Sequence, residues 1–144
     1  MPVFGAIRDD ILDLIIELAP VVNVSKGEFF FREADEGDSM FVLETGKVAI
    51  EKEHDKKKYF LSCMGPGDCF GEMELIDLGT RSASAVAVED CTAIEISTGT
   101  LYKVYKEDPQ QFAMIHMNMG REVSRRLRKA DELLFQKKVE ADFD

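Results

Sequence analysis

Residues 70–87 read FGEMELIDLGTRSASAVA and contain the side chains with the clearest chemical purpose in the chain. Gly71 can turn the backbone tightly or bring it close to a ligand, because glycine has no Cβ atom. Residues 72–77 can form a short helical turn, whose first N–H groups lack helical partners and attract anions. Arg81 follows at the start of a predicted strand, and its planar guanidinium can offer two parallel donors to a phosphate. The stretch therefore predicts an anion-binding turn.

Glu72 narrows the kind of anion. Its carboxylate stands at the opening of the turn and can accept hydrogen bonds from sugar hydroxyls, while Arg81 can neutralise one phosphate charge. Residues 82–84 are small, so the backbone there can also approach a ligand closely. Together these features indicate a small ligand with a ribose and a single cyclic phosphate.

Around this stretch the sequence alternates as strands do. Val22 and Val24 begin the alternation, and glycines then separate several short β-prone runs. These runs are residues 28–32, 39–44, 47–53, 58–64, 82–88 and 92–97. Many short strands at this spacing favour a sandwich or a barrel. Residues 54–58, HDKKK, are polar and charged and predict an exposed hairpin turn.

Helical patterns flank the strands on both sides. Residues 8–19 carry apolar side chains at helical spacing and are followed by Pro20. A short amphipathic helix is expected after Thr98, and Pro109 begins a longer pattern that continues to about residue 138. Apolar residues recur along it at steps of three and four: Phe112, Ile115, Met119, Val123, Leu127, Ala130 and Leu134. Such a stripe is typical of packing within the chain or of a coiled-coil seam with a second copy.

Composition limits the classes of function. The 144 residues include 18 basic and 28 acidic side chains, for a net charge of -10 at pH 7, so we expect one domain that repels nucleic-acid phosphates. The basic residues concentrate at 121–129, where a solvated helix face or a partner contact is expected. Cys63, Cys69 and Cys91 form no CxxC pair, and buried reduced thiols are expected rather than a zinc site. No secretory signal or membrane-length apolar run is present, which predicts a cytoplasmic protein without a membrane contact.

The sequence resembles the cyclic-nucleotide-binding domain family, which includes catabolite activators, kinase regulatory subunits and nucleotide-gated channels. The family signature, F-G-E-hydrophobic-small-L followed by P-R-x-A-small-V, is matched by residues 70–75 and 80–86. The resemblance extends over about residues 7–138. Upstream segments also fall at the family's early turns and strands: residues 27–28, 36–43 and 46–48.

The resemblance implies an α+β fold for one domain comprising residues 1–144. About eight antiparallel strands would form a jelly roll, or double-stranded β-helix, over about residues 21–97. An N-terminal helix, a short phosphate-cassette helix and a long C-terminal helix would complete it, with the C-terminal helices at about 98–138.

The resemblance also implies a role for each site residue. Glu72 would bind the ribose 2′-hydroxyl, and Arg81 would pair with the exocyclic phosphate oxygens. The last helix would cover the base, and Ala130 and Asp131, which follow the Arg-Arg-Leu run at 125–127, would touch it. Backbone N–H groups would complete the phosphate cradle at or near Gly71, Met73, Glu74, Ser82 and Ala83.

Two residues depart from the family pattern. Thr80 stands where proline is usual, and Glu74 stands where a small residue is usual. A Glu74 carboxylate that pointed inward would repel the phosphate. We expect it to point to solvent, because an acidic side chain avoids burial unless it is paired.

The expected ligand is cAMP rather than cGMP, because adenine needs few polar contacts in this family. A cGMP ligand stays open, since the Ser82 hydroxyl could reach the guanine amino group and Asp131 could accept from either base. The predicted function is a regulatory module that signals by movement of its C-terminal helix, through a protein partner or a homodimer. The alternative is an interaction or structural domain with a degenerate pocket.

An enzyme is not expected, because the chain offers no nucleophile–base constellation and few metal ligands. No bound cofactor is expected either. Few residues follow the last helical pattern, so no DNA-reading segment and no direct nucleic-acid contact are expected.

Overall fold

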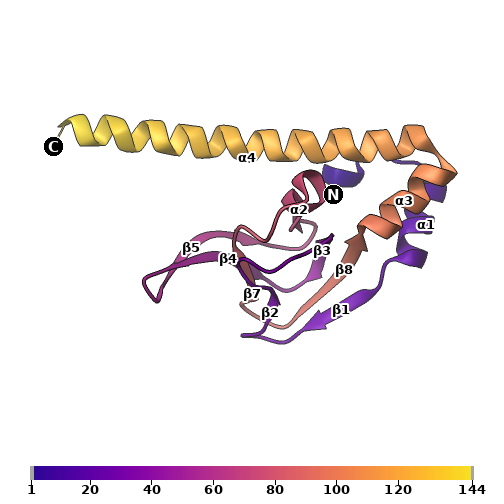
Figure 1. The fold of residues 1–144 in the computed structure, drawn as a ribbon, viewed down its shortest axis with the longest axis horizontal. Coiled ribbons are helices and arrows are strands. Elements are labelled where there is room, and N and C mark those ends of the chain that lie inside the picture. The colour runs from indigo at the N-terminus through magenta and orange to yellow at the C-terminus, as the bar shows by residue number, and fades with distance from the viewer. Residues whose placement is uncertain (1, 144) are drawn as a thin grey trace.

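The structure is a computed structural model that describes residues 2–143 (Figure 1). It confirms the predicted fold: eight antiparallel strands in two sheets, an N-terminal helix, a short helix within the roll and a long C-terminal helix. In chain order the elements are η1 (Pro2–Phe4), α1 (Asp9–Leu18), β1 (Val21–Val24), β2 (Phe29–Phe31), β3 (Ser39–Thr45), β4 (Val48–His54), β5 (Lys57–Met64), β6 (Cys69–Phe70), α2 (Met73–Asp77), β7 (Ser84–Ala87), β8 (Cys91–Ser97), α3 (Thr98–Glu107) and α4 (Pro109–Phe143).

The two sheets have the strand orders β1-β8-β3-β6 and β2-β7-β4-β5. Their facing sides bury a cluster of four phenylalanines, whose ring centroids lie 5.0 to 6.2 Å apart: Phe30, Phe31, Phe41 and Phe70. Phe70 belongs to β6, a strand of two residues that pairs Phe70 with Phe41 of β3. The phosphate-binding stretch predicted from the sequence therefore begins within the buried core of the roll.

Helices α1 and α3 lie at one end of the roll, and α4 runs along one side of it (Figure 1). Ile11 and Ile15 of α1, Val104 of α3, and Ile115 and Met119 of α4 belong to one buried apolar cluster. The N-terminal segment also lies against α4, where the Asn118 side-chain amide donates to the backbone oxygens of two residues near the N-terminus. The first part of α4 is therefore fixed to the body of the domain.

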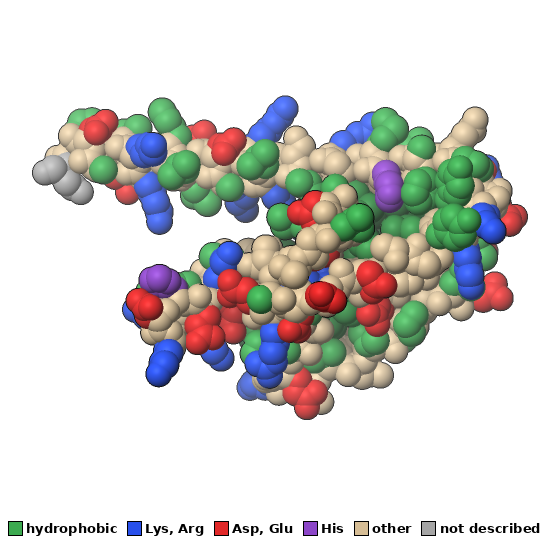
Figure 2. Space-filling view, in the orientation of Figure 1, with side chains coloured by type: hydrophobic (Ala, Val, Ile, Leu, Met, Phe, Trp, Pro, Cys, Tyr) green, Lys and Arg blue, Asp and Glu red, His purple; other side chains and the backbone are tan. Residues whose placement is uncertain are grey.

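The second part of α4 extends away from the body (Figure 1). Ile115 and Met119 are fully buried, whereas Leu127 and Leu134 of the same predicted stripe are 60% and 57% exposed. Figure 2 shows hydrophobic side chains along this extended part, between charged ones. Packing within the chain therefore explains only the first half of the stripe.

The described residues 2–143 test several smaller expectations. The charged hairpin turn is confirmed, since Asp55 and Lys56 have positive φ angles of 51° and 65° between β4 and β5. Cys69 and Cys91 are buried, but the prediction of a buried thiol is wrong for Cys63, which lies on the largely solvent-facing strand β5.

Membrane and metal features were searched over the same residues. No helix within 2–143 is long and apolar enough to cross a membrane. The described chain also has no group of three or more His, Cys, Asp or Glu side chains placed to hold a metal ion.

Candidate functional site

The predicted anion-binding turn lies between β6 and β7. Gly71 has a φ angle of 80°, and a Cβ atom there would lie 2.8 Å from Nη1 of Arg81 and 3.2 Å from the Phe31 ring. Glycine is therefore required by both the backbone conformation and the available space. The short helix α2 follows and ends at Leu78, which takes the left-handed conformation with a φ angle of 59°. One residue of α2, Glu74, contacts the buried Arg81.

Arg81 is buried, with 3% of its surface exposed. Its Nη1 donates to the Gly71 backbone oxygen at 2.9 Å, its Nη2 donates to the Ser39 backbone oxygen at 2.8 Å, and its guanidinium lies 4.1 Å from the Phe31 ring centroid. Gly37 makes room for it, because a Cβ atom at that position would lie 2.4 Å from Nε of Arg81. The guanidinium is thus held in one orientation by backbone oxygens and a ring.

Glu74 does not point to solvent, so that prediction is wrong. The side chain is 4% exposed; its Oε2 accepts from Nη1 of Arg81 at 3.0 Å, and its Oε1 accepts from the Ser82 backbone N–H at 3.3 Å. An acidic side chain avoids burial unless it is paired, and Arg81 supplies the pair. The expectation failed because it treated Glu74 as a lone carboxylate.

Glu72 is also buried, with 1% of its surface exposed. Arg126 of α4 approaches it, pairing Nη1 with the Glu72 carboxylate while Nη2 donates to the Cys69 backbone oxygen at 2.7 Å. Burial raises the pKa of Glu72, and the attraction of Arg126 opposes that rise. The long helix is therefore joined to the predicted ribose-binding residue by an ion pair.

Arg126 was not singled out by sequence reasoning. It belongs to the basic cluster at 121–129, which was expected to be a solvated face or a partner contact. Helical spacing places Arg126 four residues after Glu122, whose carboxylate lies 3.6 Å from its Nε. That i, i+4 pair was the available signal that one arginine of the cluster is held in position.

A small cavity of about 150 Å³ lies where these residues meet. Most of the predicted site residues line it, together with Arg126: Gly71, Glu72, Met73, Glu74, Ser82 and Ala83. Arg81 is not among the lining residues, and the Glu74 carboxylate, which is bonded to its guanidinium, does line the cavity. The predicted phosphate cradle is thus assembled, with a carboxylate inside it.

A wider cleft of about 520 Å³ adjoins this cavity, between β5 and α4. Ser62, Met64 and Arg126 line both spaces, and Ala130 lines the cleft. Asp131, the second predicted base contact, is exposed and lines neither space. The structure therefore brings Ala130 near the cradle and leaves Asp131 on the surface of α4.

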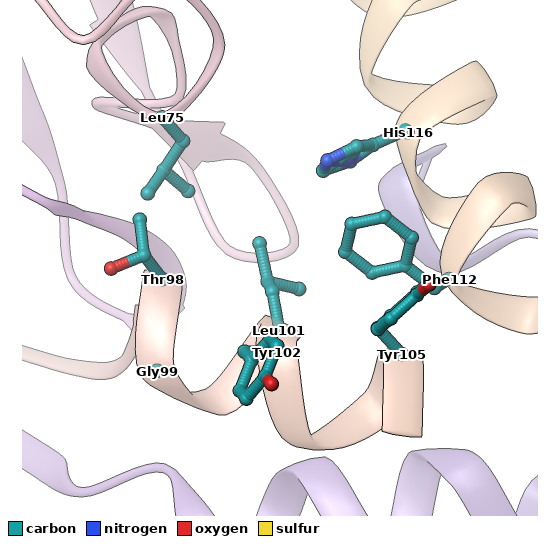
Figure 3. A pocket seen from close by; sticks show the side chains of 8 residues that line it. All are labelled: Leu75, Thr98, Gly99, Leu101, Tyr102, Tyr105, Phe112 and His116. Carbon is teal, nitrogen blue, oxygen red and sulfur yellow. The ribbon is translucent and has the colours of Figure 1, made fainter. Parts of the chain in front are cut away.

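An apolar pocket of about 660 Å³ lies on another side of α2, between α3 and the start of α4 (Figure 3). Leu75, Leu101 and Phe112 point into it, and the His116 ring lies 4.3 Å from the Phe112 ring centroid. Burial lowers the pKa of His116 below its usual value. No carboxylate or guanidinium lines this pocket, so it does not suit a phosphate. Leu75 nevertheless links it to the short helix of the cradle.

The fold and the cradle define a jelly-roll domain with a small buried cavity beside a short helix. The sequence matches the family described as Cyclic nucleotide-binding domain over residues 21–108. The chain belongs to the cyclic nucleotide-binding domain family. It is a regulatory domain of the type found in receptor proteins and kinase regulatory subunits.

Individual relatives agree with this family. The chain is 31% identical over 131 residues to the Cyclic AMP receptor protein of Thermus thermophilus, covering 90% of this chain and 59% of the relative. It is 26% identical over 133 residues to the CRP-like cAMP-activated global transcriptional regulator of Mycobacterium tuberculosis, covering 92% of this chain and 58% of the relative. The chain thus spans about three fifths of the length of these relatives.

A solved structure shows the same arrangement. The crystal structure of the Thermus thermophilus catabolite activator protein superposes with a TM-score of 0.81 at 31% identity, covering 93% of this chain and 62% of that one.

The human cGMP-dependent protein kinase 2 is 33% identical over 96 residues, covering 62% of this chain and 12% of the kinase.

Proposed function

We propose that this chain senses a cyclic nucleotide, with cAMP preferred over cGMP, and passes the signal on through its last helix. The observation that carries the proposal is the meeting of Glu72 and Arg126 at one small cavity beside the cleft along α4, with Arg81 bonded to Gly71 and Glu74 of the same lining. Glu72 binds the ribose 2′-hydroxyl. Arg81 and the N–H groups around Gly71, Met73, Ser82 and Ala83 bind the phosphate. The base lies in the cleft between β5 and α4.

Two observations favour cAMP. Two relatives that match over most of this chain are a cyclic AMP receptor protein and a cAMP-activated regulator, whereas the cGMP-dependent kinase matches over a shorter span. The Ser82 hydroxyl, the candidate contact for a guanine amino group, lies 4.0 Å from the Met73 sulfur and is exposed. Ala130 offers an apolar contact to the base, which adenine tolerates.

The output of the domain follows from the ion pair between Arg126 and Glu72. A ribose hydroxyl bound to Glu72 competes with Arg126 for the same carboxylate, so ligand binding changes the position of α4. The exposed apolar residues on the second half of α4 are the surface through which a second copy or another protein receives the change.

Isothermal titration calorimetry with cAMP and with cGMP tests this function. We expect saturable binding of cAMP and weaker binding of cGMP. Arg81→Gln should weaken cAMP binding by about 2 kcal/mol or more, because a charge-assisted double contact is lost. Arg32→Gln, which removes an exposed arginine elsewhere on the roll, is the matched control.

Circular dichroism of both variants separates loss of binding from loss of folding. Glu72→Ala provides an independent test of the ribose contact. Absence of heat with millimolar nucleotide, or an unchanged affinity in folded Arg81→Gln, contradicts the proposal.

A second candidate function has one observation in its favour. The Glu74 carboxylate already fills the anion position in front of Arg81, as expected of an interaction domain whose pocket no longer binds nucleotide. The same titrations decide between the two functions.

A further inference from the structure

Glu74 makes with the cradle the same kinds of contact that a phosphate would make. One carboxylate oxygen accepts from the Arg81 guanidinium, and the other accepts from the Ser82 backbone N–H. Glu74 and Ser82 line the small cavity that holds most of the predicted site, whereas Arg81 does not line it. The Glu74 carboxylate thus offers two oxygens and one negative charge to donors that are also suited to a phosphate.

The guanidinium retains donor capacity beyond this pair. Within residues 2–143, Nε of Arg81 is the buried side-chain nitrogen or oxygen atom without a hydrogen-bond partner. A buried donor without a partner is costly, and proteins rarely keep one. Glu74 therefore does not satisfy all the hydrogen-bond donors of Arg81, although the Arg81 side chain is almost completely buried.

We propose that Glu74 is a built-in anion that occupies the phosphate position, so that a nucleotide phosphate binds only by displacing the Glu74 carboxylate from Arg81. The proposal rests on the function proposed above and names the residue that sets its affinity. A carboxylate and a phosphate held on one buried guanidinium repel each other at close range in a poorly solvated site, which favours displacement of the carboxylate.

The structure provides a place for the displaced carboxylate. Glu74 lines the small cavity on one side and, on the other, an outer cleft of about 580 Å³ next to Leu78 and Thr80. Movement of α2, which has only five residues, could carry the carboxylate from one space to the other. The outer cleft also contains Glu36 and Asp38, whose charges oppose the arrival of a third carboxylate. Glu36 and Asp38 therefore favour the state in which Glu74 stays bonded to Arg81.

This exchange affects only ligands that carry a phosphate. Adenosine has the ribose and the base of cAMP and lacks the anion, so it can bind Glu72 and the cleft without displacing Glu74. A chain without the Glu74 charge should then favour cAMP over adenosine more strongly than the wild-type chain does.

The test is calorimetric titration of wild type, Glu74→Gln and Asp77→Asn with cAMP and with adenosine. Glu74→Gln should raise cAMP affinity by roughly tenfold or more, because the competing charge is removed while an acceptor for Arg81 remains. Its adenosine affinity should change by less than about twofold, since no phosphate is involved. Asp77→Asn is the matched control: it removes one exposed acid from the same helix and should leave both affinities unchanged.

Melting temperatures show whether the Glu74→Gln variant is folded. Without ligand, Glu74→Gln should melt at a lower temperature than wild type, because Arg81 loses a charged partner. Saturating cAMP should then raise its melting temperature more than that of wild type. A crystal structure of the wild-type complex with cAMP needs no variant, and there the phosphate should contact Arg81 with Glu74 turned away.

Each outcome has a distinct meaning. Equal cAMP affinity in wild type and folded Glu74→Gln overturns the role of Glu74 and leaves the proposed sensing function intact. Binding by Glu74→Gln alone supports the role of Glu74 and overturns sensing by the unmodified chain. Absence of cAMP binding by both the wild type and folded Glu74→Gln overturns both proposals. A wild-type complex in which Glu74 and the phosphate contact Arg81 together overturns only the role of Glu74.

Discussion

Glu72 is a buried carboxylate whose ionisation is opposed by its surroundings. Burial is the largest influence on its pKa and raises it, while Arg126 acts in the opposite direction. The folded state therefore binds the proton more tightly than the unfolded state. The resulting contribution to the free energy of unfolding is present below the unfolded pKa, near 4.5, and is lost as the pH rises through the folded pKa.

This sign predicts the behaviour of Glu72→Gln. As the pH rises from about 4 to about 7, the melting temperature of wild type should fall relative to that of the variant, because only wild type must ionise a buried acid. Differential scanning fluorimetry across this range measures the difference, with exposed Glu107→Gln as the control. A difference that moves in favour of wild type would mean that the Arg126 pair outweighs burial.

Gly37 leaves the space that the Arg81 guanidinium occupies. A Cβ atom there would meet Nε of Arg81 at 2.4 Å, so Gly37→Ala should push the guanidinium out of its present orientation. We expect cAMP affinity to fall by about tenfold, since hydrogen bonds to charged groups contribute about 1.5–3 kcal/mol. Titration calorimetry measures this. Gly65→Ala is the control, because a Cβ atom at Gly65 meets nothing within 4 Å; equal effects of the two changes would contradict the prediction.

The sequence was informative about which residues meet and less informative about how they pair. Motif spacing predicted Gly71, Glu72 and Arg81 as one site, and the structure places them together. The partners of the charges, Arg81 for Glu74 and Arg126 for Glu72, come from other elements of the fold. Such pairs depend on the three-dimensional arrangement, which local spacing does not contain.

At the scale of elements, the two-residue strand β6 has an influence beyond its length. Phe70 is 1% exposed within the four-phenylalanine cluster, and the next residue is the glycine that starts the cradle. Phe70→Ala should lower the free energy of unfolding by about 3–5 kcal/mol, the usual cost of removing a buried aromatic ring. Urea unfolding checks this value.

Phe60→Ala is the matched control for that change, because Phe60 on β5 is 65% exposed. Its effect should stay within about 0.5 kcal/mol, as for most surface substitutions. A cost at Phe70 similar to that at Phe60 would show that the cluster does not hold the cradle in place.

Strand prediction succeeded where alternation was long enough to recognise. The runs at residues 39–44, 47–53 and 58–64 correspond to β3, β4 and β5 within one residue at each end. β6 was not predicted, because two residues carry no measurable period and its pairing with β3 is non-local. The helical pattern from Pro109 was correct in kind, but α4 continues to Phe143, five residues beyond the expected end.

At the scale of the whole molecule, the second half of α4 leaves apolar side chains uncovered. Leu127, Leu134 and Phe135 are each more than half exposed. Burial of such residues is favourable, so we expect two copies to associate through this part of α4. Multi-angle light scattering at tens of micromolar should give about twice the chain mass of 16.2 kDa.

Leu134→Asp should shift this assembly toward the monomer, because it places a charge on the apolar surface. Lys138→Asp changes an exposed charged residue on the same helix and is the control for charge alone. A monomeric wild type, or a dimer insensitive to Leu134→Asp, would contradict self-association through this part of α4.

The attachment of α4 near the N-terminus turns the helix into a lever arm. Asn118 donates to the backbone oxygens of Val3 at 3.0 Å and of Gly5 at 2.8 Å, which fixes one point of the helix, and Arg126 makes a second attachment through Glu72 and the Cys69 backbone oxygen. From Asn118 to Phe143 the helix is roughly 37 Å long, so a rotation of about 10° around the fixed point would displace its tip by roughly 6 Å. Arg126 lies close to that fixed point, and a small displacement at Glu72 would therefore be geometrically amplified toward the tip.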